Sequence, residues 1–215
     1  YQVPLGFSFK PGQFVGIRVI PTHTRAYSIV AIENGLLELL VDTKPGGIAS
    51  QYFEKTQVGD EAQILGPYGI YGIKSDLPSK IFICTGTGVA PFIPMVRSLF
   101  IRSDLGMIQE SHHQNVQIKM LFGTRTDSND IAYGYFKDLP SDQFEYLQCV
   151  TREEPKNTYS IKGRVTEAMS NMISNNTIDP VNTEFYICGG KEMINDVVAV
   201  IKTAGGDKIY FEKYG

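Results

Sequence analysis

Residues 81–94, with the sequence IFICTGTGVAPFIP, constrain the fold of this chain more than any other stretch. Ile81 to Cys84 form a short apolar run of the kind that a fully buried parallel strand needs. The glycines of Gly86-Thr87-Gly88 follow, and Pro91 and Pro94 suit the first turn of a helix, where the N–H groups lack intrahelical partners. A strand that runs through glycines into a helix presents N–H groups where an anion can bind. The stretch therefore predicts an α/β unit with a candidate phosphate-binding turn.

This turn is not a standard nucleotide motif. Ala90-Pro91 stands where G-x-G-x-x-G would require its third glycine, and the Gly-Lys-Ser/Thr ending of a P-loop is missing. Taken alone, the turn is equally consistent with a tight strand–helix connection that binds nothing. Its interpretation therefore depends on the rest of the chain.

From residue 80 onward, strand patterns alternate with helical patterns. We predict strands at 80–84, 116–122, 144–150, 184–188 and 207–212, and helices at 91–102, 130–139, 163–174 and 191–204. Five strands with four crossovers predict a five-stranded parallel sheet in an α/β domain. Ligands of such sheets bind at the carboxyl ends of the strands. Residues 103–115, which include His112-His113, form a polar excursion.

The sequence of the first third of the chain predicts β structure. We predict strands at 14–20, 26–32, 36–43 and 61–65, and one helix at 48–55. Short strands separated by turn residues favour an antiparallel β-barrel. We place the boundary between the barrel and the α/β domain so that the two span residues 1–76 and 77–215.

The composition excludes several classes of function. A net charge of −3 and an isoelectric point near 5.7 give no reason to expect nucleic-acid binding. No apolar run approaches the roughly 20 residues of a membrane span. Cys84, Cys149 and Cys188 lack the spacing of a zinc or iron–sulfur site, so we expect no metal. Buried reduced thiols fit a reducing, cytoplasmic location.

Several further motifs occur in a fixed order along the chain. They are Pro11-Gly12-Gln13-Phe14, Arg25-Ala26-Tyr27-Ser28, Gly46-Gly47-Ile48-Ala49-Ser50, Gly66-Pro67-Tyr68-Gly69, Gly123-Thr124-Arg125, Cys188-Gly189-Gly190 with Met193, and Phe211-Glu212-Lys213-Tyr214. Together with the turn at 85–88, this set resembles the ferredoxin–NADP⁺ reductase family over essentially the whole chain. The family usually has another strand before its Pro-Gly-Gln-Phe segment, so we expect an N-terminal segment, and any targeting peptide, to be missing before Tyr1.

The resemblance implies a flavin site in the first domain. Arg25 and Tyr27 alternate on a strand and so face the same way, where a guanidinium and a phenol can hold a pyrophosphate and a flavin ring. The Gly46–Ser50 segment opens a helix whose N–H groups can bind a phosphate. The residues assigned to FAD are Arg25, Ala26, Tyr27, Ser28, Gly46, Gly47, Ile48, Ala49, Ser50 and Tyr214. Gly215 extends the chain beyond the terminal tyrosine of the family pattern.

The resemblance also implies an NADP(H) site in the second domain. Its expected residues are Thr85, Gly86, Thr87, Gly88, Pro91, Gly123, Arg125, Thr151, Arg152, Tyr159, Arg164, Cys188, Gly189, Gly190 and Met193. An additional ribose phosphate needs fixed positive charge, which Arg152 supplies. NADH-specific relatives present an acidic residue in this region, and Glu153 and Glu154 leave NAD(H) as the less favoured alternative.

Three residues are expected to act in catalysis. The resemblance places Ser28 near the flavin N5 atom, and Cys188 and Glu212 beside the position of hydride transfer. We therefore expect an FAD-dependent oxidoreductase that exchanges hydride with NADP(H) and single electrons with a carrier protein of the ferredoxin or flavodoxin type. The alternatives are the reductase component of an oxygenase system, a free-flavin reductase, and a flavin- or nucleotide-binding module without turnover.

Overall fold

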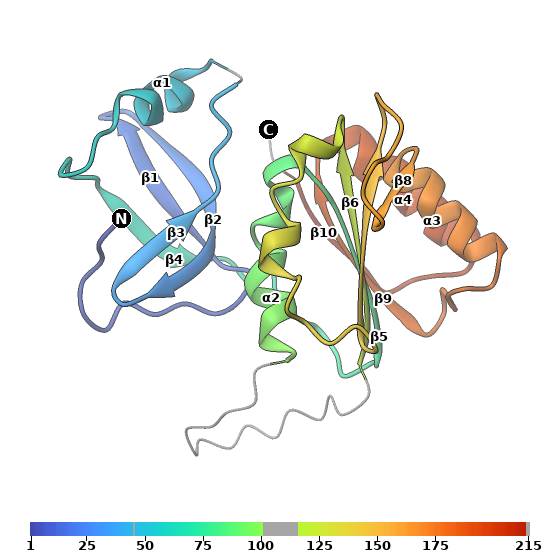
Figure 1. Cartoon of the computed structure of the whole chain (residues 1–215). Coiled ribbons are helices and arrows are strands. Elements are labelled where there is room, and N and C mark those ends of the chain that lie inside the picture. The colour runs from blue at the N-terminus through green and yellow to red at the C-terminus, as the bar shows by residue number, and fades with distance from the viewer. Residues whose placement is uncertain (45, 101–115, 214–215) are drawn as a thin grey trace. The chain divides into compact units, whose positions relative to one another are not determined.

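The computed structural model describes residues 1–44, 46–100 and 116–213 (Figure 1). The chain divides into two compact units. The first comprises Tyr1–Ile73 and Ala90–Ser98, and the second comprises Lys74–Val89 and Leu99–Gly215. The predicted class, an antiparallel β unit followed by a parallel α/β unit, is confirmed.

The first unit is built on a four-stranded antiparallel sheet with the order β3-β2-β1-β4. Its strands are β1 (Phe14–Ile20), β2 (His23–Glu33), β3 (Leu36–Leu39) and β4 (Ile64–Tyr68), and its first helix is α1 (Ile48–Lys55). Residues of one sheet face meet in a core of branched apolar side chains: Val3, Val15, Ile17, Val19, Ile29 and Leu37. Helix α2 (Phe92–Ser98) belongs to the same unit, and Phe92 packs near Tyr71 with ring centroids 6.2 Å apart.

Three predicted strands of this unit have different bounds. The strand predicted at 26–32 is longer in the structure and spans His23–Glu33. The strand predicted at 61–65 is observed at Ile64–Tyr68, because Leu65 and Tyr68 pair with β1 across the Gly66-Pro67 step. The strand predicted at 36–43 ends at Leu39. Beyond it, the Asp42 carboxylate accepts a hydrogen bond from the Lys44 N–H, which forms a local turn in place of a ladder.

The second unit is built on a parallel sheet with the order β10-β9-β5-β6-β7-β8. The strands are β5 (Ser79–Thr85), β6 (Gln117–Thr124), β7 (Phe144–Val150), β8 (Ser160–Lys162), β9 (Thr183–Gly189) and β10 (Ile209–Lys213). Helices α3 (Val165–Ser174) and α4 (Lys191–Thr203) cover one face of the sheet (Figure 1). Their apolar stripes pack on Ile81, Ile83, Leu121, Phe185 and Ile187.

The sheet has six strands, so the prediction of five was wrong. β8 is only three residues long and pairs with β7 from Gln148↔Ser160 to Val150↔Lys162. A strand this short carries no readable alternation in sequence. It forms because the edge of β7 offers free backbone groups, and the Ser160 hydroxyl also donates to the Gln148 side chain at 2.7 Å.

The helix predicted at 130–139 was also wrong. The structure has two short 3-10 turns instead, η2 (Asp127–Asn129) and η3 (Tyr133–Tyr135). The Asp130 carboxylate accepts hydrogen bonds from the backbone N–H groups of Ala132 and Tyr133 and from the Tyr146 hydroxyl. An aspartate that captures nearby N–H groups competes with a helical ladder. The helix predicted at 91–102 is observed at Phe92–Ser98, and the polar excursion at 103–115 lies outside the described residues.

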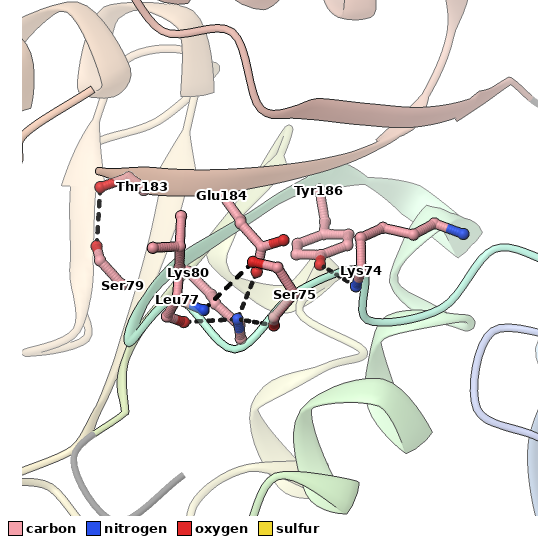
Figure 2. A network of polar contacts seen from close by, with 8 residues as sticks. All are labelled: Lys74, Ser75, Leu77, Ser79, Lys80, Thr183, Glu184 and Tyr186. Atoms are coloured by element: carbon pink, nitrogen blue, oxygen red, sulfur yellow. Dashed lines mark hydrogen bonds and ion pairs between the residues drawn. The ribbon is translucent and has the colours of Figure 1, made fainter. Parts of the chain in front are cut away.

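A buried polar network fixes the segment that leads into β5 (Figure 2). Lys80 and Glu184 lie on adjacent strands, have no exposed side-chain surface and form an ion pair. The Lys80 ammonium group also donates to the carbonyl oxygens of Ser75 and Leu77, at 2.9 and 2.7 Å. All three ammonium protons of Lys80 therefore have acceptors, as a buried cation requires.

Two further bonds attach the same segment to β9. The Tyr186 hydroxyl accepts the Lys74 N–H at 2.8 Å, and the hydroxyls of Ser79 and Thr183 lie 2.9 Å apart (Figure 2). Residues 74–79 therefore belong structurally to the second unit. In the part of the chain that the structure describes, no helix is long and apolar enough to cross a membrane.

Candidate functional site

The order of the parallel strands defines where a ligand can bind in the second unit. The chain moves from β5 outward to β6, β7 and β8, and later returns to the other side of β5 with β9 and β10. Such a reversal leaves a crevice at the carboxyl ends of the two strands where it occurs, here β5 and β9. The predicted residues Thr85 and Gly189 end these two strands, so the structure brings them together.

Two predicted glycines at this edge make room for Thr85. A Cβ on Gly189 would lie 2.9 Å from the Thr85 Oγ1 atom and 2.3 Å from the Met193 Cε atom, and a Cβ on Gly123 would lie 2.9 Å from the Thr85 Cγ2 atom. A side chain at either of these two positions would therefore displace Thr85. Gly86 has a φ of +53°, a conformation that favours glycine, and it turns the chain directly after Thr85.

The remaining predicted residues of this turn occupy a short 3-10 segment. Gly86–Val89 forms η1, in which Thr87 is half-buried and Gly88 is buried. Pro91 directly precedes α2. Gly190 caps α4, and a Cβ on it would meet no atom within 4 Å, so its backbone borders open space.

Cys188 and Glu212 are direct neighbours across β9 and β10, in register with each other and with Cys84 on β5. Cys188 is only 5% exposed, and burial, followed by the nearby Glu212 charge, raises the pKa of its thiol to about 12. Burial also raises the pKa of the half-buried Glu212 carboxyl. Near neutral pH, the site therefore presents a neutral thiol beside a carboxyl group that holds its proton more tightly than usual.

A second group of predicted residues lies at the carboxyl ends of β6 and β7. We call residues 125–131 the post-β6 loop and residues 151–159 the post-β7 loop. The Arg152 N–H donates to the Arg125 carbonyl at 2.8 Å, and the Thr151 hydroxyl donates to the Thr124 carbonyl at 3.0 Å. These bonds hold the two arginines at neighbouring backbone positions.

Some charged side chains of this region form ion pairs, and others do not. Glu154 pairs with Lys162 at 3.0 Å, and Glu153 lies 4.0 Å from Lys156. Within the described residues, no carboxylate lies at ion-pair distance from Arg125, Arg152 or Arg164, and all three arginines are exposed. A group of guanidinium ions without acidic partners is suited to binding an anion.

Tyr159 completes this second group. Its ring stacks on Tyr133 with a centroid separation of 4.0 Å and an interplanar angle of 11°, and it meets the edge of Tyr146 at 5.7 Å. One face of Tyr159 is thus covered by the protein. A planar ligand could stack only on its other face.

The predicted flavin residues of the first unit lie on β2 and α1. Arg25 is exposed near the start of β2, and Tyr27, two residues on, is half-buried against Phe53 of α1 with ring centroids 5.1 Å apart. Burial raises the pKa of Tyr27, which the Arg25 charge partly opposes. Ser28 lies opposite Phe14 on the other face of the strand, and Ala26 opposite Gly16.

Helix α1 presents its N-terminus at the end of the sheet where β1 finishes (Figure 1). Gly46 has a φ of +68°, and Gly47 caps the helix without a side-chain hydrogen bond. The first-turn N–H groups of Ile48, Ala49 and Ser50 are thereby available to an anion. The Ser50 side chain itself is only 4% exposed, and Tyr214 lies outside the described residues.

Sequence reasoning missed the residues that hold the two loops together. Gln148 is fully buried in β7, and its amide group donates to the Thr124 hydroxyl at 3.0 Å and the Asp127 carbonyl at 3.1 Å. The Asp127 N–H in turn donates to a Glu153 carboxylate oxygen at 2.8 Å. A glutamine within the mostly apolar run from Tyr146 to Val150 was the one available signal, since a buried amide must find partners.

Two family profiles match the chain. The profile described as Oxidoreductase FAD-binding domain matches residues 4–72, and the one described as Oxidoreductase NAD-binding domain matches residues 82–199. Among characterised relatives, the chain is 26% identical over 216 residues to the toluate 1,2-dioxygenase electron transfer component of Pseudomonas putida. It is also 26% identical over 225 residues to the reductase component of propane 2-monooxygenase from Rhodococcus jostii.

These alignments include 96% and 98% of this chain, but only 59% and 57% of the two relatives. The chain thus spans less than two thirds of their length. Among solved structures, the fold is similar to that of a ferredoxin NADP⁺ reductase from Neisseria gonorrhoeae with bound FAD and NADP. The TM-score is 0.76 at 23% identity, covering 98% of this chain and 89% of the other. A cytochrome P450 reductase from Amycolatopsis gives a TM-score of 0.78 at 24% identity, covering 96% and 61%.

Proposed function

Because the chain belongs to the ferredoxin–NADP⁺ reductase-like family of oxidoreductases, with an FAD-binding and an NAD-binding domain, we propose that it transfers hydride from NADPH to FAD and passes single electrons to a protein acceptor. The observation that carries this proposal is the distribution of residues along one edge of the parallel sheet. Glycine-lined strand ends with Cys188 and Glu212 lie at the β5–β9 reversal, and arginines without a carboxylate partner among the described residues lie beyond β6 and β7.

In this proposal the nicotinamide half of the nucleotide lies against the strand ends. Thr85 to Gly88, Gly189 and Gly190 receive its phosphates and ribose through backbone N–H groups, and the glycines among them let the ligand approach the backbone closely. Met193 and Pro91 border the same region. Cys188, as a neutral thiol, and Glu212, which retains a proton to higher pH, orient and shield the nicotinamide ring. A bound FAD supplies the hydride-accepting and single-electron chemistry.

The adenosine half is proposed to lie over the post-β6 and post-β7 loops. Arg125, Arg152 and Arg164 are the candidate ligands of a ribose phosphate, and Tyr159 the candidate stacking partner of the adenine. The acidic residues of the region support NADP(H) over NAD(H). Glu153 accepts a backbone N–H and Glu154 pairs with Lys162, so both carboxylates already have partners within the protein.

FAD is proposed to bind the domain assigned to residues 1–76, of which residues 74–76 lie in the second structural unit. The exposed Arg25 guanidinium and the first-turn N–H groups of the helix that Gly46 to Ser50 open would bind the pyrophosphate, because both offer positive charge to an anion. Tyr27, Ala26, Ser28 and Tyr214 are the proposed contacts of the flavin ring. Residues 77–215 are proposed as the nucleotide-binding domain.

The named relatives support an electron-transfer role. Toluate 1,2-dioxygenase and propane 2-monooxygenase each have a component described as an electron transfer or reductase component. We infer that the acceptor of this chain is a ferredoxin- or flavodoxin-type carrier, or an oxygenase component that receives electrons directly. The proposed location is the cytoplasm, where its three free cysteines would stay reduced.

Anaerobic titration of the FAD-loaded protein tests the proposal. We expect NADPH to bleach the flavin absorbance rapidly and NADH to do so more slowly. A subsequent one-electron acceptor should restore the absorbance. Protein that takes up no FAD, or whose bound flavin neither nucleotide reduces, would refute the function. Reduction of free flavin without retention of FAD would instead identify a free-flavin reductase.

A further inference from the structure

The post-β6 and post-β7 loops are joined by two reciprocal hydrogen bonds. The Asp127 N–H donates to the Glu153 Oε1 atom at 2.8 Å, and the Lys156 N–H donates to the Asp127 Oδ2 atom at 2.6 Å. Each loop thus supplies one carboxylate to a backbone N–H of the other. Bonds to a charged acceptor are the stronger class of protein hydrogen bond.

The same two loops carry the arginines of the proposed phosphate site. Arg125 and Arg152 are joined through their backbones at 2.8 Å, which brings two positive side chains onto neighbouring positions. Like charges at such positions favour separation of the loops unless something holds the loops together. Several bonds join the two loops, and among them the Glu153–Asp127 bond is the one whose acceptor directly follows Arg152 and whose donor lies two residues after Arg125.

Glu153 and Glu154 differ sharply in their surroundings, although they are adjacent in sequence. The Glu153 side chain is 32% exposed and bonded to the other loop, whereas the Glu154 side chain is 85% exposed and pairs only with Lys162 at the surface. A carboxylate that determines cofactor choice by repelling a phosphate should face the ligand. Glu153 instead has one oxygen committed to the post-β6 loop.

We propose that Glu153 is a positioning residue for the phosphate-bearing nucleotide. By holding Asp127, it keeps the post-β6 loop against the post-β7 loop so that Arg125 and Arg152 meet the same anionic group. The inference rests on the proposed function, because the anion is the ribose phosphate of NADP(H). The negative charge of Glu153 alone would suggest that it repels a phosphate. In this proposal Glu153 instead promotes phosphate binding.

Two conservative variants distinguish a positioning role of Glu153 from repulsion of the phosphate by its charge. Glu153→Gln keeps an oxygen acceptor at the same reach and removes the charge. Glu153→Asp keeps the charge and withdraws the acceptor by one methylene. Positioning predicts that the aspartate variant binds the phosphate-bearing ligand most weakly, and that the glutamine variant, which keeps a neutral acceptor, stays closer to wild type and binds no tighter. Charge repulsion predicts that the glutamine variant binds phosphate more tightly and the aspartate variant resembles wild type.

The experiment is calorimetric titration of the FAD-loaded full chain with adenosine 2′,5′-bisphosphate, and with 5′-AMP as the matched ligand that lacks the 2′-phosphate. We expect Glu153→Asp to weaken binding of the bisphosphate about tenfold, the loss expected for one charge-assisted hydrogen bond. Binding of 5′-AMP should change much less. Glu154→Gln is the control for the loss of one negative charge from the post-β7 loop, and it should bind both ligands like wild type.

Amide hydrogen exchange measures the contact itself. The Asp127 N–H should exchange faster in Glu153→Asp than in wild type, and less so in Glu153→Gln, which keeps an acceptor at the same reach. Steady-state kinetics should show a higher KM for NADPH in Glu153→Asp, with kcat nearly unchanged. Tighter binding of the bisphosphate by Glu153→Gln, or unchanged binding by Glu153→Asp, would overturn the inference alone. Wild-type protein that binds neither ligand would refute the proposed function as well.

Discussion

At the scale of single residues, the burial of the Glu212 carboxyl group makes the stability of the folded protein depend on pH. It is half-buried next to Cys188, and the loss of hydration raises its pKa above the ordinary value of 4.5. The folded protein therefore binds this proton more tightly than the unfolded chain does. Its contribution to stability is present below pH 4.5 and is lost as pH rises through the raised pKa.

We predict that wild type loses stability relative to Glu212→Gln over this pH window. Glutamine has a similar shape and does not titrate, so the difference in free energy of unfolding between the two proteins isolates the proton of Glu212. Urea unfolding at a series of pH values measures it. Cys188→Ala is the control, because a thiol with a pKa of about 12 does not titrate there. A difference that does not vary with pH would show that Glu212 titrates normally.

At the scale of elements, the buried Lys80–Glu184 pair fastens the segment at 74–79 to strands β5 and β9. Removing one member leaves the other as an unpaired buried charge. When Lys80 is removed, the Glu184 Oε2 atom loses its ion-pair partner, and the Glu184 Oε1 atom already has no hydrogen-bond partner among the described residues. A double replacement removes both charges together.

We predict that Lys80→Met lowers the free energy of unfolding by about 3–5 kcal/mol and Glu184→Leu by a similar amount. The double variant should lose clearly less than the sum of the two, because neither charge remains unpaired. Denaturant unfolding of all four proteins completes the cycle. Ser79→Ala is a milder control, since it removes only one hydroxyl contact with Thr183. Additive losses would show that the two charges do not interact appreciably.

At the scale of the whole molecule, each unit has its own hydrophobic core. Val15, Ile17 and Ile29 lie in one, and Ile83, Leu121 and Ile187 lie in the other. A ligand stabilises the unit that binds it by an amount that grows with the logarithm of its concentration, about 2.7 kcal/mol at a concentration of 100 times Kd. FAD and NADP⁺ should therefore stabilise different parts of the chain.

Differential scanning calorimetry should reveal this separation. We expect FAD to raise the unfolding temperature of one transition and adenosine 2′,5′-bisphosphate that of the other. Hydrogen exchange would assign each transition, with β1 and β2 protected by FAD and β6 and β7 by the bisphosphate. A single transition that both ligands shift equally would contradict the prediction.

The sequence by itself determined the elements whose pattern is local. The helix at 48–55 and the strand at 144–150 have the bounds predicted from hydrophobic spacing and flanking turn residues, and the alternation after residue 80 predicted the parallel sheet. The family resemblance grouped Cys188 with Glu212, and the structure has these two residues in register on adjacent strands.

Tertiary structure decided the elements and roles that depend on distant partners. Asp130 replaced a predicted helix by bonding the Tyr146 hydroxyl, and β8 formed on the free edge of β7. Glu153 bonds a residue 26 positions away, and Lys80 a residue 104 positions away. Hydrogen bonds and ion pairs leave no periodicity in sequence, because each depends on where the backbone brings two groups together. The sequence therefore indicated which groups could bind a nucleotide, and only the fold showed which of them already have partners in the protein.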